Sequence, residues 1–191
     1  MDTQSNPFID ALYTHVAFHA DGRLNDQKVD RKALAILRRG LSKSPGEDIA
    51  VYRYVIPFAP KGEELQRSYF IVASLFAVHP CQRPNERFSF GVSWRKLQQQ
   101  DTSSEESCER RFIALINAPS DIVHEHLRHA VALMKAKSVA VDWEQLLKDL
   151  MRWDNPNRST QRNWARDFWK KDPNIATSAN GTELSVSNSD E

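Results

Sequence analysis

The fold is decided by residues 108–153, which read CERRFIALINAPSDIVHEHLRHAVALMKAKSVAVDWEQLLKDLMRW. Three stretches within this segment carry apolar residues at helical spacing on one side and arginine or lysine on the other. The turn Ala118-Pro119-Ser120 separates the first two stretches, and a short bridge near Ser138 separates the last two. This pattern predicts an all-α helical bundle with a basic exterior.

A rotation of about 100° per residue places the apolar positions of each stretch on one helix face. They are Cys108, Phe112, Leu115 and Ile116, then Val123, Leu127, Ala130 and Met134, and then Trp143, Leu146, Leu147 and Leu150. Ser120 is expected to cap the second helix, and Asp142, three residues before Gln145, the third. Thr102 and Ser103 stand at capping-box spacing before the first.

The rest of the chain contains further helical patterns. Helices are expected over residues 7–18, 28–39, 49–57, 63–78, 90–97 and 159–171. The β-branched and aromatic residues of 49–57 would also suit a strand, but no partner strand is evident elsewhere. We therefore interpret that segment as a helix that ends at Pro57.

A polar connection divides the predicted helices into two groups. Residues 98–106, QQQDTSSEE, contain no apolar position. This connection predicts a small helical lobe over residues 1–97 and a second over residues 98–171. Residues 172–191 are polar and lack any periodicity, which predicts a disordered acidic tail.

Composition indicates a soluble globular chain with an uneven charge distribution. Among 191 residues, 27% are charged and 40% hydrophobic, and the net charge is +1. The tail carries four acidic residues and no lysine or arginine, which leaves 26 basic and 21 acidic residues before it, a net charge of +5. A basic body with an acidic tail points weakly to nucleic acid and is equally compatible with no such role.

Cysteine usage and hydropathy predict a cytoplasmic protein. Neither Cys81 nor Cys108 has zinc-ligand spacing around it, and Cys108 lies on an apolar helix face, as expected for a buried free thiol. The N-terminus has no signal-peptide pattern. The longest apolar run, residues 69–78, is too short to span a bilayer.

No motif predicts an enzyme, a metal site or a cofactor. Residues 124–129, HEHLRH, resemble a zinc-protease motif, but His124 and His129 lie about 140° apart around a helix and cannot share one metal. A solvated surface explains this cluster better. Residues 91–95, GVSWR, begin like a nucleophile elbow and lack its closing glycine. No phosphate-binding glycine loop is present.

The repeated basic faces are the remaining functional signal. Arginine outnumbers lysine and forms the doublets Arg38-Arg39 and Arg110-Arg111. Arginine suits bidentate phosphate contact and stacking on bases. Any soluble bundle needs polar outer positions, and for each single residue that explanation is the stronger one. Taken together, the faces favour a surface that follows a phosphate backbone without reading sequence.

Ordered strings within the chain resemble the CasB family, the small subunits of the type I-E CRISPR surveillance complex, Cascade. The N-terminal strings are Leu37-Arg38-Arg39-Gly40-Leu41, Pro45-Gly46, Tyr52-Arg53-Tyr54-Val55 and Pro57-Phe58. The C-terminal strings are Glu109-Arg110-Arg111-Phe112, Leu115-Ile116, Leu127-Arg128 and Asp142-Trp143, ending at Trp153. The resemblance covers roughly residues 10–170, and its specificity lies in their joint order.

This resemblance implies an all-α subunit in antiviral defence with no catalytic activity. Members of the family pair as two copies, beside the subunits that carry the guide RNA. Their basic surface holds the target strand and the displaced strand of the R-loop. In such systems base pairing reads the sequence and protein holds the backbone.

The resemblance also implies which residues bind nucleic acid. Arg110, Arg111 and Arg128 match the basic positions of the family best, followed by Arg53, and Arg158 and Arg162 align more loosely. Lys135 joins this set because it lies seven residues after Arg128, on the same side of its helix. Asn117, His129 and Val92 stand where the family usually has a basic residue, which puts an unchanged DNA path in doubt.

Two other functions remain open. A stand-alone helical DNA-binding regulator would need a recognition helix that presents base-reading side chains, and we identify none. A protein-only helical scaffold would leave the arginines merely solvated.

Overall fold

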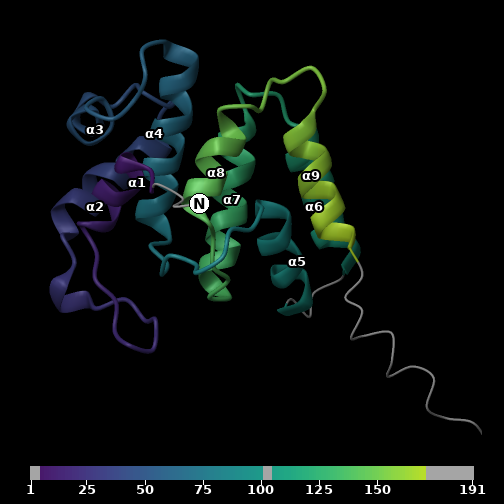
Figure 1. Ribbon diagram of the computed structural model, residues 1–191, viewed down its shortest axis with the longest axis horizontal. Helices are drawn as coiled ribbons and strands as arrows, with labels where there is room; N and C mark the ends of the chain where they lie inside the picture. The colour runs from purple at the N-terminus through teal and green to yellow at the C-terminus, as the bar shows by residue number, and fades with distance from the viewer. Residues whose placement is uncertain (1–4, 101–104, 171–191) are drawn as a thin grey trace, which may run out of the picture.

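A computed structural model describes residues 5–100 and 105–170 of the chain. Within them it contains nine α-helices and no β-strand, which confirms the all-α prediction (Figure 1). The helices are α1 (Pro7–Tyr13), α2 (Arg31–Arg39), α3 (Ile49–Val55), α4 (Glu63–Val78), α5 (Phe90–Gln100), α6 (Glu105–Asn117), α7 (Val123–Ala136), α8 (Trp143–Leu150) and α9 (Ser159–Trp169). In this described part, no helix is both long and apolar enough to cross a membrane.

Helix α4 lies at the centre of the bundle. Every residue from Ser68 to Ala77 is buried, because α4 packs against α2 and α3 on one side and against α7 and α8 on the other. Figure 1 shows α1–α3 at one end of the long axis and α5, α6 and α9 at the opposite end. Because other helices cover α4 on both sides, its central position requires apolar side chains all round the helix.

The helices before and after residue 98 share one hydrophobic core. Helix α5 packs most closely on α9, where a Cβ atom added to Gly91 would lie 2.2 Å from the carbonyl oxygen of Trp164. Glycine at this position lets the two helix backbones approach each other. The two-lobe division at residue 98 stays a prediction.

Side-chain caps set two helix starts. The Asp142 carboxylate accepts a hydrogen bond from the Gln145 amide at 3.0 Å, as the sequence predicted. Asp30 caps α2 by accepting from the Ala33 amide at 2.9 Å, so α2 begins at Arg31 and the predicted start at residue 28 was wrong. Residues 26–28 form a separate 3₁₀ turn, and Val29 is extended.

Other predicted boundaries were also wrong. Helix α1 ends at Tyr13 instead of residue 18, because the chain turns back and the Asn25 amide donates to the Ala17 carbonyl at 2.8 Å. Helix α7 begins at Val123 with Ile122 at its N-cap position, so Ser120 is not the cap.

The remaining boundaries differ by a few residues. Helix α3 ends at Val55 and α9 at Trp169, slightly before their predicted ends. Helix α5 continues through Gln100, so residues 98–100 of the predicted polar connection are helical. The proposed caps Thr102 and Ser103 and the predicted tail lie outside the described residues.

Residues 79–89, which we call the strap, cross the molecule between α4 and α5. The ring Nε2 of His79 lies 2.8 Å from the Val139 carbonyl, and the Cys81 sulfur accepts from the Val141 amide at 3.3 Å. The hydroxyl of Tyr13 donates to the Cys81 carbonyl at 3.0 Å. These contacts join the strap to α1 and to the segment before α8.

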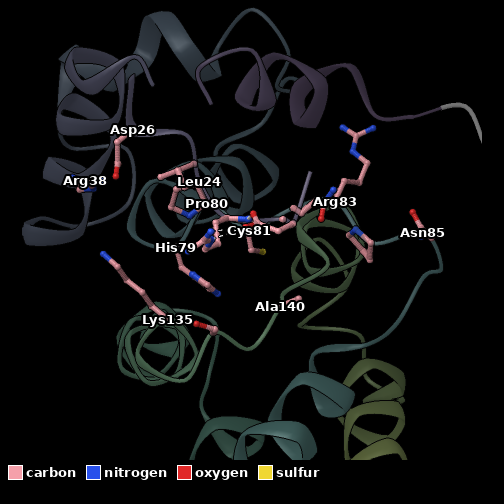
Figure 2. A pocket seen from close by; sticks show the side chains of 16 residues that line it. Leu24, Asp26, Arg38, His79, Pro80, Cys81, Arg83, Asn85, Lys135 and Ala140 are labelled. Atoms are coloured by element: carbon pink, nitrogen blue, oxygen red, sulfur yellow. Dashed lines mark hydrogen bonds and ion pairs between the residues drawn. The ribbon is translucent and has the colours of Figure 1, made fainter. Parts of the chain in front are cut away.

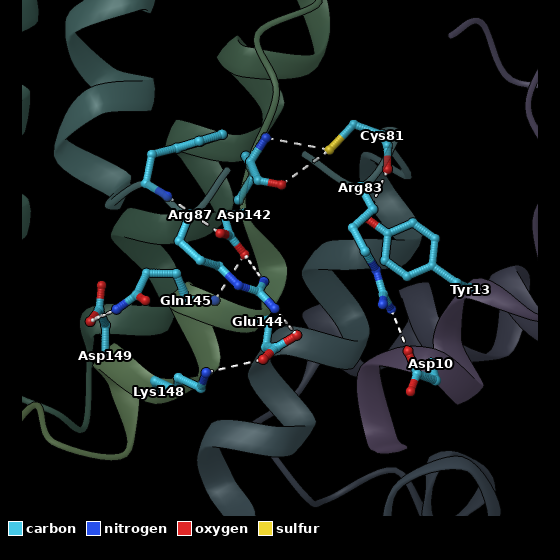
Figure 3. Close-up of polar contacts among 12 residues, drawn as sticks. Asp10, Tyr13, Cys81, Arg83, Arg87, Asp142, Glu144, Gln145, Lys148 and Asp149 are labelled. Atoms are coloured by element: carbon cyan, nitrogen blue, oxygen red, sulfur yellow. Dashed lines mark hydrogen bonds and ion pairs between the residues drawn. The ribbon is translucent and has the colours of Figure 1, made fainter. Parts of the chain in front are cut away.

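Two arginines fasten the remainder of the strap (Figure 3). Arg83 forms an ion pair with Asp10 at 2.6 Å. Arg87 pairs with Asp142 at 3.0 Å and also with Glu144. The carboxylates of Asp142 and Glu144 are almost completely buried, and Arg87 supplies charge and hydrogen bonds that offset the cost of their burial.

Candidate nucleic-acid interface

A cavity of about 840 Å³ opens between residues 21–26, the strap and the C-terminal end of α7. Arg38 of α2 and Lys135 of α7 border it, and Figure 2 shows both nearer to His79 than to Asn85. We call this cavity the strap pocket. It brings together two cations that lie far apart in the sequence.

Arg38 is positioned by the end of α4. Its Nε donates to the Ala77 carbonyl at 2.6 Å, one of the helix-terminal carbonyls that lack a partner within α4. Within the described residues its two terminal nitrogens have no hydrogen bond or ion pair. Lys135 lies in the last turn of α7, where a cation also interacts favourably with the helix dipole. Its ammonium group is exposed and has no ion-pair partner in the described ranges.

Of the other charged residues around the strap pocket, Arg23 and Arg83 are ion-paired, whereas the Asp26 carboxylate has no ion-pair partner in the described residues. Arg23 pairs with Asp21 at 2.7 Å. Burial, together with the charge of Lys135, lowers the pKa of His79, although its hydrogen bond to Val139 partly opposes this shift. His79 is therefore neutral at pH 7, and since a carbonyl only accepts, its Nε2 carries the proton. Arg38 and Lys135 are the cations best placed to meet an anion here.

A second cavity, of about 490 Å³, lies beside the first half of α7. Arg128 borders it and donates to the Leu41 carbonyl at 3.1 Å, and Lys43 lines the opposite wall. Seven residues separate Arg128 from Lys135, which corresponds to about 10 Å along one face of a helix. Helix α7 therefore presents one predicted cation to each cavity, and we call this surface the α7 face.

The histidines of α7 do not form a metal site in this structure. Among the described residues, no group of three or more histidine, cysteine, aspartate or glutamate side chains could hold a metal ion. His124 is half-buried, and burial together with the nearby charge of Arg67 lowers its pKa. It is therefore neutral at pH 7 and adds no charge to the second cavity.

The remaining predicted arginines fall into two separate places. Arg110 and Arg111 on α6 and Arg162 on α9 are exposed, and since α6 packs on α9 we refer to these three residues together as the α6–α9 face. Arg53 lies on α3, at the opposite end of the long axis (Figure 1), where its guanidinium covers the Tyr54 ring at 4.7 Å. The structure therefore does not gather all seven predicted residues into one site.

Arg158 has a structural task within the α6–α9 face. It is the N-cap residue of α9, with a left-handed φ of 49°. Its Nη2 donates to the Ile116 carbonyl at 2.7 Å and to the Asn117 side-chain oxygen at 3.0 Å. One terminal nitrogen is thus occupied at the end of α6, which leaves Arg158 less available to a phosphate than Arg162.

The predicted site residues do not include Arg38, Lys43 or any residue of the strap. Arg38 was visible as half of an arginine doublet, but only the fold shows that it shares a cavity with Lys135. The strap residues Gln82 and Asn85 gave no signal, because nothing in the sequence places them beside α7.

Comparisons with known proteins identify the family. A family model described as CRISPR-associated protein Cse2 matches residues 33–169. A curated CRISPR-associated protein Cse2 from Thermus thermophilus is 35% identical over 150 residues, which span 77% of this chain and 84% of that protein. The chain belongs to the Cse2 family. The resemblance to CasB is confirmed, since crystal structures of both names are similar to this fold.

Solved structures extend the match to three dimensions. A crystal structure of a Cse2-family protein from Thermus thermophilus has a TM-score of 0.68 and 31% identity, covering 86% of this chain and 99% of that one. The crystal structure of CasB from Thermus thermophilus gives a TM-score of 0.67 and 30% identity over the same shares. A chain of a CRISPR RNA-guided surveillance complex has a TM-score of 0.64 and 29% identity, covering 73% of this chain and 82% of that one.

The Cse2 match includes both basic faces. Residues 33–169 extend from α2 to α9 and contain Arg38, Arg128 and Lys135 as well as the α6–α9 face. Helix α1 and residues after 169 lie outside it.

Proposed function

We propose that this Cse2-family chain is a non-catalytic subunit of a CRISPR RNA-guided surveillance complex and binds nucleic acid through the phosphate backbone. The observation that carries the proposal is the α7 face, where Arg128 and Lys135 each open onto a cavity bordered by a second cation, Lys43 and Arg38. Its likeness to a chain of such a complex supports the assembly.

Backbone contact explains the kind of side chain found at these positions. Arginine and lysine neutralise phosphates and release condensed counterions, a term that does not depend on base sequence. Cations about 10 Å apart along α7 can each contact a phosphate of the same strand. Binding is therefore sequence-independent and weakens steeply as salt rises.

Two separate basic faces favour a role with two strands. The α7 face and the α6–α9 face lie on different helices, and the two groups of helices meet where α6 packs against α7. One face holds the target strand and the other the displaced strand of an R-loop. Other subunits carry the guide RNA, and a second copy of this chain lies beside the first. Stabilising the R-loop in this way serves antiviral defence.

A non-catalytic role agrees with the ion pairing of the two buried carboxylates Asp142 and Glu144. Asp142 and Glu144 are held by Arg87, and Glu144 also by Lys148 at 3.0 Å. Such groups stabilise the fold and do not face either cavity.

Salt-dependent binding of a labelled strand tests the proposal. The triple variant Arg110→Ala, Arg111→Ala, Arg128→Ala should bind about tenfold more weakly or worse, and the slope of log affinity against log salt should fall by roughly 2 for single strands. Helicity and melting should be nearly unchanged because all three side chains are exposed. Unchanged affinity would contradict the assignment.

A matched control removes the same charge elsewhere. Lys28, Lys61 and Arg152 are exposed and lie outside both faces, so their triple alanine variant should keep a salt slope close to wild type. Strong preference for one duplex sequence would favour a stand-alone regulator. A chain that binds no strand even at low salt would be a protein-only scaffold.

A further inference from the structure

We infer that the strap pocket receives one unpaired nucleotide of the bound strand, with its phosphate at Arg38 and Lys135 and its base against the strap. This inference rests on the proposed function, and it adds a base-holding subsite to a surface that otherwise contacts only the backbone.

The dimensions of the strap pocket suit one nucleotide. Its volume of about 840 Å³ falls within the range of roughly 300–1,000 Å³ typical of small-ligand sites. Residues 21–26 form one wall, the strap another, and the segment from Ser138 to Ala140 a third. A base that is unstacked can enter between these walls, whereas a base pair within a duplex cannot.

Besides charged residues of both signs, the lining contains apolar and amide side chains. Leu24 and Pro80 lie close together near the middle of the pocket (Figure 2) and offer apolar contact to a base. Gln82 and Asn85 contribute side-chain amides, each of which can both donate and accept hydrogen bonds, as the polar edge of a base requires. The phosphate and the base thus meet different groups.

Contacts within the protein hold the walls of the pocket together. Gly22 has a φ of +81°, and a Cβ atom added there would lie 2.8 Å from the Gln82 side-chain oxygen, so the first wall reaches the strap closely. The strap is in turn fixed by the Cys81–Val141 and Arg83–Asp10 contacts. Walls that are fixed by such contacts lose less conformational entropy on binding.

The consequence is a preference for strands whose bases are available. A duplex must unstack and unpair a base to fill the pocket, which opposes binding, whereas a single strand presents its bases at little cost. The displaced strand of an R-loop is single-stranded, so it is the strand that the pocket fits.

The experiment compares three labelled ligands by fluorescence anisotropy with the full chain at one salt concentration. They are a mixed-sequence single strand, a strand of equal length in which the central nucleotides are abasic, and the corresponding duplex. We expect the abasic strand to bind about fivefold more weakly or worse than the intact strand, because it keeps the phosphates and loses the base contacts.

A double variant connects this difference to the pocket. Gln82→Ala with Asn85→Ala should reduce the difference between intact and abasic strands at least twofold and leave the abasic affinity unchanged. Both side chains are exposed, and circular dichroism verifies the fold. The control variant Gln100→Ala with Asn157→Ala removes two exposed amides outside the pocket and should keep the full difference.

The outcomes separate this inference from the proposed function. Equal affinities for intact and abasic strands, each still salt-dependent, would overturn the base subsite and leave backbone binding intact. A difference that persists in the Gln82 and Asn85 variant would place the base elsewhere and also overturn it. Displacement of the strand by a nucleoside monophosphate, without any effect of base removal, would mean that the pocket serves a free nucleotide. Absence of salt-dependent binding to every ligand would overturn the proposed function itself.

Discussion

The guanidinium of Arg158 donates a hydrogen bond to the backbone carbonyl of Ile116 at 2.7 Å. This contact joins the start of α9 to the last turn of α6, whose terminal carbonyls have no partner within the helix. An arginine that resemblance assigns to nucleic acid therefore also holds two helices together.

Replacing Arg158 by alanine should lower the free energy of unfolding by about 1–2 kcal/mol, because two hydrogen bonds at the end of α6 are lost. Urea denaturation followed by circular dichroism measures this change. Arg162→Ala is the matched control and should stay within about 0.5 kcal/mol of wild type, since Arg162 is exposed and makes no such contact in the described part of the chain. In DNA binding the order should reverse, with Arg162→Ala the weaker binder.

Glu144 should contribute stability that disappears in acid. Burial raises the pKa of its carboxyl, but hydrogen bonds and charge from Lys148 and Arg87 outweigh burial, and the net pKa lies below its ordinary value of 4.5. The contribution is thus fully present above about pH 4.5 and is lost as the pH falls through the lower folded-state pKa.

The variant Glu144→Gln should therefore be less stable than wild type at pH 7, by about 1.5–3 kcal/mol, and should lose less stability on acidification. Chemical denaturation at several pH values between 7 and 3 measures both effects. Glu86→Gln changes an exposed carboxylate of the strap and serves as the control. A Glu144→Gln curve parallel to that of wild type would argue against the Arg87 and Lys148 pairing.

Gly91→Ala should destabilise the packing of α5 on α9. Alanine favours a helix by about 1 kcal/mol over glycine. Here, however, its Cβ would lie 2.2 Å from the Trp164 carbonyl oxygen, so backbone must move. We expect a net loss of about 2–3 kcal/mol and a fall in Tm of roughly 5–10 °C, measured by calorimetry. Val92→Ala, on the same helix and only half-buried, should cost less. Equal melting of the two variants would contradict this close approach.

The pKa of His79 should report on the strap pocket. It is lowered first by burial and then by the charge of Lys135, so Lys135→Ala should raise it. Imidazole chemical shifts followed by nuclear magnetic resonance across pH 5–8 measure the change. Lys137→Ala, which removes an exposed lysine close to Lys135 in the sequence, should leave the pKa of His79 unchanged. If neither variant moves the titration, Lys135 does not face the pocket.

Helix identity was predictable because it depends on local periodicity. Phe112 and Leu115 on α6, and Leu127 and Met134 on α7, are all buried, as their spacing predicted. The helix ends were less predictable, since they depend on which side chain caps them. At α2 the Asp30 carboxylate captures the Ala33 amide, and this contact excludes Val29 from a helix that its apolar character would otherwise extend.

The candidate interface was predictable as a charge pattern, whereas the spatial neighbours of its residues were not. The exposure of Arg110 and Arg128 follows from their position away from the core stripe, and Arg111 lies on the flank of its stripe. The pairing of Arg38 with Lys135 in one cavity depends on how α2 and α7 meet through α4, a tertiary relationship. The contact of Arg158 with Ile116 was hidden for the same reason, because its acceptor is a backbone carbonyl of another helix.

The strap has a consequence for how the chain could be divided. Its anchoring partners outside α1 lie in residues 139–144 and at Asp167 of α9. Helices α4 and α5 also pack against α7, α8 and α9. A cut between α5 and α6 would therefore produce two pieces. Each would expose the apolar surface that the other covers in the intact chain. If the two pieces are produced separately, they should associate when mixed, and only the mixture should show the proposed strand binding. Association of the two pieces would then measure directly how the two parts of this Cse2 fold assemble.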